Sequence, residues 1–289
     1  MQCPQLYLTF YTNLFAMTTS VLLPALSDTY SLNEAQISSF RQNGHILLPQ
    51  VVSRDEVQAY RPVINEAAYK YNTEKRRMEE RDTYGKAFLQ IMNLWEVDAQ
   101  VKAFTLARRF ARLAAQLLGV EAVRLYHDQA LYKEPKGGHT PWHQDQYYWP
   151  LDTSNTITLW MPLIDITEDL GMLTFASGSH RGGMIDNLAI SDASDAVLEQ
   201  YVMEQGYPVS RPKAMQAGDA TFHYGWTLHS APGNASPDVT REVMTIIYFA
   251  DGARVTEPKN EHQEADRQRW LGGLAPGSFA ASGLNPFLG

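Results

Sequence analysis

The 289-residue chain has a single cysteine, Cys3, so no disulfide can form within it. One thiol also excludes a metal site built from several cysteines. Positive charge is scarce: 24 Lys and Arg face 32 Asp and Glu, for a net charge of −8, which disfavours binding to a phosphate backbone. These absences predict a cytoplasmic protein without a nucleic-acid partner.

The chain also lacks a long uninterrupted hydrophobic run. The stretch Met1–Ser27 is apolar, but no basic residue occurs before Arg41, and a secretory signal begins with positive charge. Polar residues and Pro24 interrupt the stretch before about 18 apolar residues accumulate. We therefore expect no membrane partner and interpret residues 1–29 as an N-terminal extension, with Met17 as an alternative start.

Hydrophobic residues make up 44% of the chain, which is enough for a folded core. Two capping boxes, Ser31–Glu34 and Ser53–Glu56, predict helices in its first quarter. A short strand, His45–Pro49, is expected between them. Apolar residues recur at helical spacing from Phe104 to Leu118 and predict a helix that ends at Gly119.

From Ala122 onward the hydrophobic period changes to two, which is typical of strands. Val123, Leu125, His127, Gln129 and Leu131 are then expected on one face of the first strand. Further strands are predicted at 156–164, 172–176, 220–223, 227–231 and 243–249. We predict a mainly β fold with flanking helices, a double-stranded β-helix (a cupin-like jelly roll), over residues 30–250. Residues 251–289 are expected to pack on this domain as a tail.

The motif Trp142-His143-Gln144-Asp145 carries the candidate chemistry. In a strand, residues two apart point to the same face, so His143 and Asp145 could reach one ion. His229, in a predicted strand far along the chain, is the candidate third ligand. Two histidines and one carboxylate form the facial triad that leaves three positions open on Fe(II).

Two alternatives compete with this ligand set. His262-Gln263-Glu264 also matches a His-x-acid pattern, but its hydrophilic surroundings favour a solvated helix face. His223 lies six residues before His229 and is an alternative third ligand. The remaining histidines are interpreted as structural.

Arg241 opens the last apolar strand, twelve residues after His229. A guanidinium there could pair with the distal carboxylate of a keto acid that chelates the iron. The competing interpretation is an exposed arginine at a strand edge.

Residues from about Tyr30 to Ala250 resemble the phytanoyl-CoA dioxygenase family of Fe(II)- and 2-oxoglutarate-dependent oxygenases. The resemblance is carried by motifs in a fixed order: Ser31–Pro49, Gln129–Pro135, His143–Asp145 with Tyr148–Pro150, Trp160–Leu163, Asp169–Leu173, Gly178–His180, Gly218–Asp219 with Phe222–His223, Leu228–Asn234, and Arg241. It implies that His143, Asp145 and His229 bind Fe(II) and that Arg241 holds 2-oxoglutarate.

The resemblance further implies that Gln129, Lys133 and Trp160 approach the keto acid. The chain departs from the family at Glu168–Gly171, where relatives more often carry Glu-Asn-Gly, so the rim of the pocket is expected to differ. Relatives that halogenate replace the carboxylate ligand with a small residue. Asp145 therefore disfavours halogenation.

The default activity that the resemblance implies is hydroxylation of an unactivated C–H bond, with O2 as oxidant and release of succinate and CO2. Desaturation and ring closure stay open as outcomes, because they would need only a differently placed substrate. The acidic composition favours a small or medium-sized, mostly apolar substrate over a coenzyme A thioester, for which only Lys86, Lys133 and Lys136 stand out as basic partners. Candidate substrate walls are Trp142 and Tyr147–Trp149 on one side, and Gln90, Met92 and Trp95 on another.

Two other functions fit a jelly roll: a metalloenzyme that uses no keto acid, and a non-catalytic binding protein. The first does not need Arg241. The second predicts no charge-transfer band with Fe(II) and 2-oxoglutarate.

Overall fold

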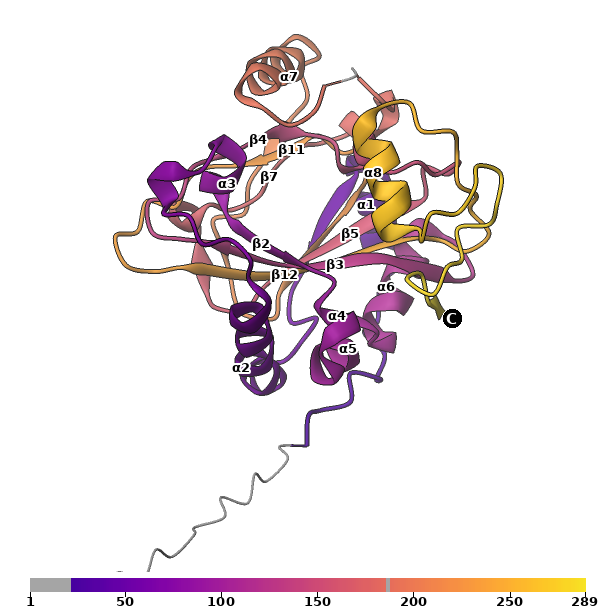
Figure 1. Ribbon diagram of the computed structural model, residues 1–289, viewed down its shortest axis with the longest axis horizontal. Coiled ribbons are helices and arrows are strands. Elements are labelled where there is room, and N and C mark those ends of the chain that lie inside the picture. The colour runs from indigo at the N-terminus through magenta and orange to yellow at the C-terminus, as the bar shows by residue number, and fades with distance from the viewer. Residues whose placement is uncertain (1–21, 186–187) are drawn as a thin grey trace, which may run out of the picture.

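The computed structural model describes residues 22–185 and 188–289. Two antiparallel sheets face each other, and helices cover the outer face of the larger one (Figure 1). This arrangement is the predicted double-stranded β-helix, so the expected fold class is confirmed. The candidate start Met17 and most of the predicted extension lie outside the described residues.

The larger sheet has the strand order β1-β10-β5-β12-β3-β13, with β2 also paired to β3. Its strands are β1 (His45–Leu48), β2 (Leu89–Met92), β3 (Val123–Lys133), β5 (Thr156–Pro162), β10 (Ala220–Tyr224), β12 (Arg241–Ala250) and β13 (Phe287–Leu288). The smaller sheet has the order β4-β11-β7-β8. Its strands are β4 (Thr140–His143), β7 (Thr174–Ala176), β8 (Val209–Ser210) and β11 (His229–Ala231), while β6 (Ile166–Thr167) pairs with β9 (Ala214–Met215).

The helices fall into two groups (Figure 1). On the outer side of the larger sheet lie α1 (Glu34–Asn43), α2 (Arg54–Tyr71), α4 (Leu94–Val97), α5 (Ala99–Thr105) and α6 (Arg108–Leu118). The others are α3 (Thr83–Ala87), α7 (Asp192–Glu204) and α8 (Glu261–Trp270), and 3-10 turns occur at η1 (Met78–Glu80), η2 (Asp145–Tyr148), η3 (Glu168–Leu170) and η4 (Ser179–Gly182).

Strand alternation divides the larger sheet into a core face and an inner face. On β5, Leu159 packs with Phe104 and Phe110 of the helical layer. The neighbouring Thr158 and Trp160 point the other way and line a cavity between the sheets. The helical layer therefore supports the sheet from behind and leaves its inner face free for chemistry.

The helix signals in the sequence are confirmed in part. Ser53 caps α2 with the predicted capping box, and Gly119 ends α6 at a φ of 75°. The predicted N-terminal cap of α1 is wrong. Asn33, not Ser31, accepts a hydrogen bond from the backbone N–H of Gln36. The helix expected from Phe104 is divided, because the backbone between α5 and α6 is extended at Ala107.

A bulge in β3 overturns the expected alternation of that strand. His127 pairs with Ile247 and Leu125 pairs with Tyr248, so Tyr126 is an extra residue without a partner on β12. Val123 and Leu125 therefore pack in the helical core, whereas His127, Gln129 and Leu131 line the cavity. The prediction placed all five on one face because a period of two cannot reveal an inserted residue.

The bulged strand also carries a buried carboxylate that joins it to the helices. Asp128 is fully buried and accepts hydrogen bonds from the backbone of Leu94 (2.9 Å) and Trp95 (3.1 Å) and from the Thr105 hydroxyl (2.8 Å). Burial raises the pKa of this carboxyl to about 6, although all three hydrogen bonds act to lower it. Asp128 thus satisfies two backbone N–H groups at the start of α4 and binds the hydroxyl of Thr105, the last residue of α5.

We expect Asp128→Ala to lower the free energy of unfolding by about 3 kcal/mol, because it leaves buried donors without an acceptor. Urea unfolding monitored by circular dichroism measures this. Asp98→Ala is the matched control, since Asp98 caps α5 with hydrogen bonds to Gln100 and Val101 at the molecular surface. Its expected cost is about 1 kcal/mol. Equal losses in the two variants would contradict the role assigned to Asp128.

The C-terminal segment packs beside the barrel. Val255, Trp270 and Leu271 form a buried apolar cluster with Tyr126 and Trp149. In the parts of the chain that the structure describes, no helix has the length and apolar character needed to cross a membrane.

Candidate active site

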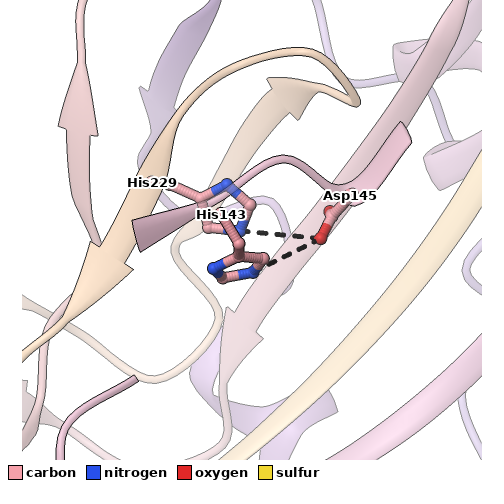
Figure 2. A group of neighbouring side chains, drawn as sticks. All are labelled: His143, Asp145 and His229. Atoms are coloured by element: carbon pink, nitrogen blue, oxygen red, sulfur yellow. Dashed lines mark ion pairs between the residues drawn. The ribbon is translucent and has the colours of Figure 1, made fainter. Parts of the chain in front are cut away.

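Three side chains predicted to share one ion converge between the two sheets (Figure 2). His143 ends β4 and pairs across the strands with His229, the first residue of β11. Asp145 begins η2. Each residue offers one ligand atom, and these atoms all lie within 4.8 Å of one another. The Nε2 atoms of His143 and His229 are 3.5 and 3.7 Å from Asp145 Oδ1.

The local geometry differs from the one predicted. The strand ends at His143, and Asp145 lies in the following turn rather than on the same strand face. The intervening Gln144 fixes that turn, because its amide donates to the carbonyl oxygens of Gly183 (2.8 Å) and Trp226 (2.7 Å). The predicted cluster is therefore present, but a turn produces it instead of strand periodicity.

Both imidazoles are held in a tautomer that suits metal binding. His143 Nδ1 lies 2.8 Å from the carbonyl oxygen of Pro141, and His229 Nδ1 lies 3.0 Å from that of Thr227. A carbonyl can only accept, so each Nδ1 donates and each Nε2 keeps its lone pair. Burial, followed by the nearby His143 ring, lowers the pKa of His229 well below its usual value. The donor set of two imidazole nitrogens and one carboxylate oxygen fits Fe(II).

The second oxygen of Asp145 has its own partners. Oδ2 accepts a hydrogen bond from the Thr158 hydroxyl at 2.8 Å and lies 3.2 Å from His223 Nε2. Burial tends to raise the pKa of Asp145, but the surrounding imidazoles outweigh it and hold the pKa well below its usual range. His223, the alternative third ligand, thus contacts the outer oxygen, while His229 faces the inner one.

The triad lines a cavity of about 240 Å³ that also contains the predicted keto-acid residues Gln129, Trp160 and Arg241. Arg241 is 2% exposed, so the competing interpretation of an exposed strand-edge arginine is wrong. No carboxylate pairs with it among the described residues, and its Nε has no hydrogen-bond partner there. An unpaired buried guanidinium is costly, which indicates a site for an anion.

The loop after η3 orients this guanidinium. Arg241 Nη1 donates to the carbonyl oxygen of Gly171, and the Arg241 guanidinium carbon lies 5.2 Å from the ring centre of Trp160. Gly171 has a φ of 80°, and a side chain there would meet Lys133 and the Pro232 carbonyl oxygen at less than 3 Å. The turn that departs from the usual family pattern therefore retains the glycine that the anchor needs.

Lys133 is placed differently from the other predicted cosubstrate residues. It pairs in register with Arg241 and is fully buried, but its ammonium donates to the Gly138 carbonyl oxygen and does not line the cavity. Burial, with the charge of Arg241, lowers the pKa of Lys133 to about 6. Its nearest link to the cavity is the Thr140 hydroxyl at 3.4 Å.

The predicted aromatic walls are confirmed only in part. Tyr148, Trp149, Gln90 and Met92 line the cavity. Trp142, Tyr147 and Trp95 do not: Trp142 packs against α7, Tyr147 contacts α8, and Trp95 belongs to the helical core. The sequence shows that Trp142 and Tyr147–Trp149 flank the metal motif, but the turn geometry of η2 decides which of them face inward.

Helix α8 supplies cavity residues that the sequence prediction missed. The run around His262–Glu264 is helical as predicted, but it is not wholly solvated. Gln263 is buried and donates to the Tyr147 carbonyl oxygen at 2.9 Å. Asp266, Arg269 and Trp270 line the cavity from this helix. Trp270, an aromatic residue at the end of this polar run, is the feature of the sequence that indicates a buried side of α8.

The model of the phytanoyl-CoA dioxygenase (PhyH) family matches residues 40–243. A methylphosphonate hydroxylase of Gimesia maris is 25% identical over 83% of this chain and 88% of its own length. Phytanoyl-CoA dioxygenase 1 of Oryza sativa subsp. japonica is 23% identical over 83% of this chain and 94% of its own.

Among solved structures, the non-heme α-ketoglutarate-dependent carbocyclase SnoK from nogalamycin biosynthesis superposes with a TM-score of 0.74. It is 26% identical to this chain, and the match covers 90% of this chain and 97% of SnoK. Together with the convergent triad, which shares its cavity with an arginine that no carboxylate of the described residues pairs with, the match confirms iron and 2-oxoglutarate as cofactors. The chain belongs to the phytanoyl-CoA dioxygenase family and is an iron- and 2-oxoglutarate-dependent oxygenase.

Proposed function

We propose that His143 Nε2, His229 Nε2 and Asp145 Oδ1 hold Fe(II), and that Arg241 binds the distal carboxylate of 2-oxoglutarate. The observation that carries this assignment is the shared cavity, in which three convergent ligand atoms accompany a buried cation that has no acidic partner within residues 22–185 and 188–289. A keto-acid dianion supplies the missing negative charge. A cupin that uses no keto acid leaves Arg241 unexplained.

The proposed reaction is hydroxylation of a C–H bond in a small or medium-sized, mainly apolar metabolite. Substrate, O2 and 2-oxoglutarate are converted to the alcohol, succinate and CO2, so one oxygen atom enters each of the two organic products. Iron bound together with 2-oxoglutarate supplies the oxidising chemistry. Retention of Asp145 favours hydroxylation over halogenation.

The chain's own residues orient and enclose the reactants. Thr158 and His223 fix the outer oxygen of Asp145, which leaves the inner oxygen directed toward the imidazoles. Gly171 holds the Arg241 guanidinium at one position. Tyr148 and Trp149 contribute aromatic surface that limits access of water to the cavity.

A small-molecule substrate is supported by the character of the relatives. One is a methylphosphonate hydroxylase, and another is a carbocyclase from nogalamycin biosynthesis. The predicted lysine partners for a coenzyme A thioester are not assembled at the cavity, since Lys86, Lys133 and Lys136 are all absent from its lining. The cytoplasmic location expected from the sequence stays a prediction.

We expect the purified protein with Fe(II), 2-oxoglutarate and O2 to form succinate slowly, and to form it faster when a true substrate is added. Screening metabolites for this stimulation, with mass spectrometry to detect a gain of one oxygen atom, identifies the substrate. A metabolite that gains oxygen without equivalent succinate would contradict the proposed stoichiometry. Absence of any succinate above an iron-free control would contradict the keto-acid reaction itself.

A further inference from the structure

The cavity contains a second polar group of residues that the proposed function does not use. His127 comes from β3, and Asp266, Arg269 and Trp270 come from α8; we name these four residues the α8 subsite. Helix α8 lies beside the space between the two sheets (Figure 1). Gln263 fastens it to the Tyr147 carbonyl oxygen in η2, the turn that carries Asp145. The subsite is therefore attached to the same turn as the triad.

His127 is a buried histidine with unused hydrogen-bonding capacity. It is 3% exposed, and its Nδ1 has no hydrogen-bond partner among the residues that the structure describes. The bulge at Tyr126 directs this side chain toward the cavity instead of the helical core. Its ring centre lies 5.2 Å from that of Trp270. A buried polar atom without a partner is costly, so an incoming hydrogen-bonding group would satisfy it.

The two charged members of the subsite lie on one helix and partly offset each other. Asp266 accepts a hydrogen bond from the Tyr126 hydroxyl at 2.9 Å. Burial raises the pKa of Asp266 to about 7, while the nearby Arg269 acts to lower it. The Arg269 guanidinium carbon lies 4.2 Å from the ring centre of Trp270. Arg269 is thus stacked on an aromatic ring and its charge acts on Asp266, whereas no carboxylate of the described residues pairs with Arg241.

The cavity wall next to the α8 subsite is apolar and aromatic. Trp149, Trp270 and Ile247 belong to one buried cluster, and all three line the cavity together with Met92. Flat aromatic side chains favour planar or ring-shaped ligands. A phosphonate or phosphate would instead need several cations or amide donors. Apart from Arg241, the Lys and Arg side chains of the described lining are limited to Arg269.

We propose that the α8 subsite binds the prime substrate as a ring compound that carries a hydroxyl group and no phosphate or phosphonate. The substrate ring packs against Trp149 and Trp270, and its hydroxyl group hydrogen-bonds to His127 and Asp266. This inference rests on the proposed function, because it places the ring in the cavity that holds the triad. It separates this chain from a relative that hydroxylates methylphosphonate.

Three matched probes test the proposal: naphthalene, 2-naphthol and 2-naphthyl phosphate. Binding to the complex with Fe(II) and 2-oxoglutarate is measured without oxygen by quenching of tryptophan fluorescence. We expect 2-naphthol to bind about tenfold more tightly than naphthalene, as one or two hydrogen bonds in a buried site allow. 2-Naphthyl phosphate should bind more weakly than 2-naphthol.

Substitutions assign the preference to His127. His127→Leu should abolish the advantage of 2-naphthol over naphthalene, and His127→Asn should restore part of it, because the amide places a polar atom near the position of Nδ1. His262→Leu is the matched control. His262 packs on Tyr147 and Tyr148 outside the cavity lining, so this variant should keep the full preference.

The outcomes separate the two proposals. Equal affinity for 2-naphthol and naphthalene, tightest binding of the phosphate, or no binding of 2-naphthol below millimolar concentration would each overturn the ring-hydroxyl assignment. In all of these cases the visible charge-transfer band of the complex would still form. Absence of that band in the unmodified protein would instead overturn the proposed roles of the triad and Arg241.

Discussion

His229→Ala is expected to abolish the visible charge-transfer band that appears when Fe(II) and 2-oxoglutarate are added without oxygen. His229 Nε2 faces the inner oxygen of Asp145 from β11, and no other imidazole in the described cavity lining occupies that position. Removal of one of three protein ligands should weaken iron binding by at least about 100-fold. Anaerobic titration with Fe(II), monitored by absorbance and by calorimetry, measures both effects.

Two other histidines provide a graded comparison. His223→Ala removes a contact to the outer oxygen of Asp145, so we expect iron affinity to fall by about 10-fold to 100-fold while the band still forms at high Fe(II). His180→Ala should leave the band unchanged, because His180 stacks on Tyr224 and contacts the Arg41 carbonyl oxygen away from the triad. If His223→Ala lost the band and His229→Ala kept it, the assigned third ligand would be wrong.

Arg241→Gln is expected to weaken 2-oxoglutarate binding by at least about 100-fold, because it removes two charge-assisted hydrogen bonds from a buried site. The same substitution should leave the ligand-free protein equally stable or more stable. Burial lowers the pKa of Arg241 to about 9, so the folded state disfavours the charged guanidinium in the absence of an anion. Titration of the charge-transfer band and thermal unfolding of the ligand-free protein measure the two effects.

Arg54→Gln is the control for this substitution. Arg54 pairs with Asp165 at 3.0 Å, and both side chains are more than half exposed. Neither 2-oxoglutarate affinity nor stability should change appreciably, since exposed ion pairs contribute little. If Arg241→Gln kept full affinity for 2-oxoglutarate, the assignment of Arg241 as the anchor of its distal carboxylate would be wrong.

The His-x-Asp pair alone did not single out the triad, because His262-Gln263-Glu264 matches the same pattern and His223 competes with His229. The ordered set of motifs from Ser31 to Arg241, which resembles one family, selected the triad and the anchor. Fold class was predictable, since period-two segments without alternating helices are typical of a jelly roll. Neither inference required the exact course of the backbone.

The details that failed depend on single-residue irregularities. Asp145 lies in a turn, β3 contains one additional residue, and Trp95 faces the helices because Asp128 binds the start of α4. Hydrophobic periodicity averages over such features. The sequence did not predict that α8 contributes to the site, because its polar composition resembles that of a solvent-facing helix. Gln263 and Trp270 are nevertheless buried.

The bulge at Tyr126 has a consequence for how relatives of this protein are compared. The bulge determines whether His127 or a neighbouring residue reaches the substrate, even when this protein and a relative have similar amino-acid sequences along the strand. A homologue shorter by one position there would present a different side chain to its ligand while its iron ligands stayed in place. Gains and losses of one amino acid at this point are therefore a route by which selectivity can diverge without loss of catalysis.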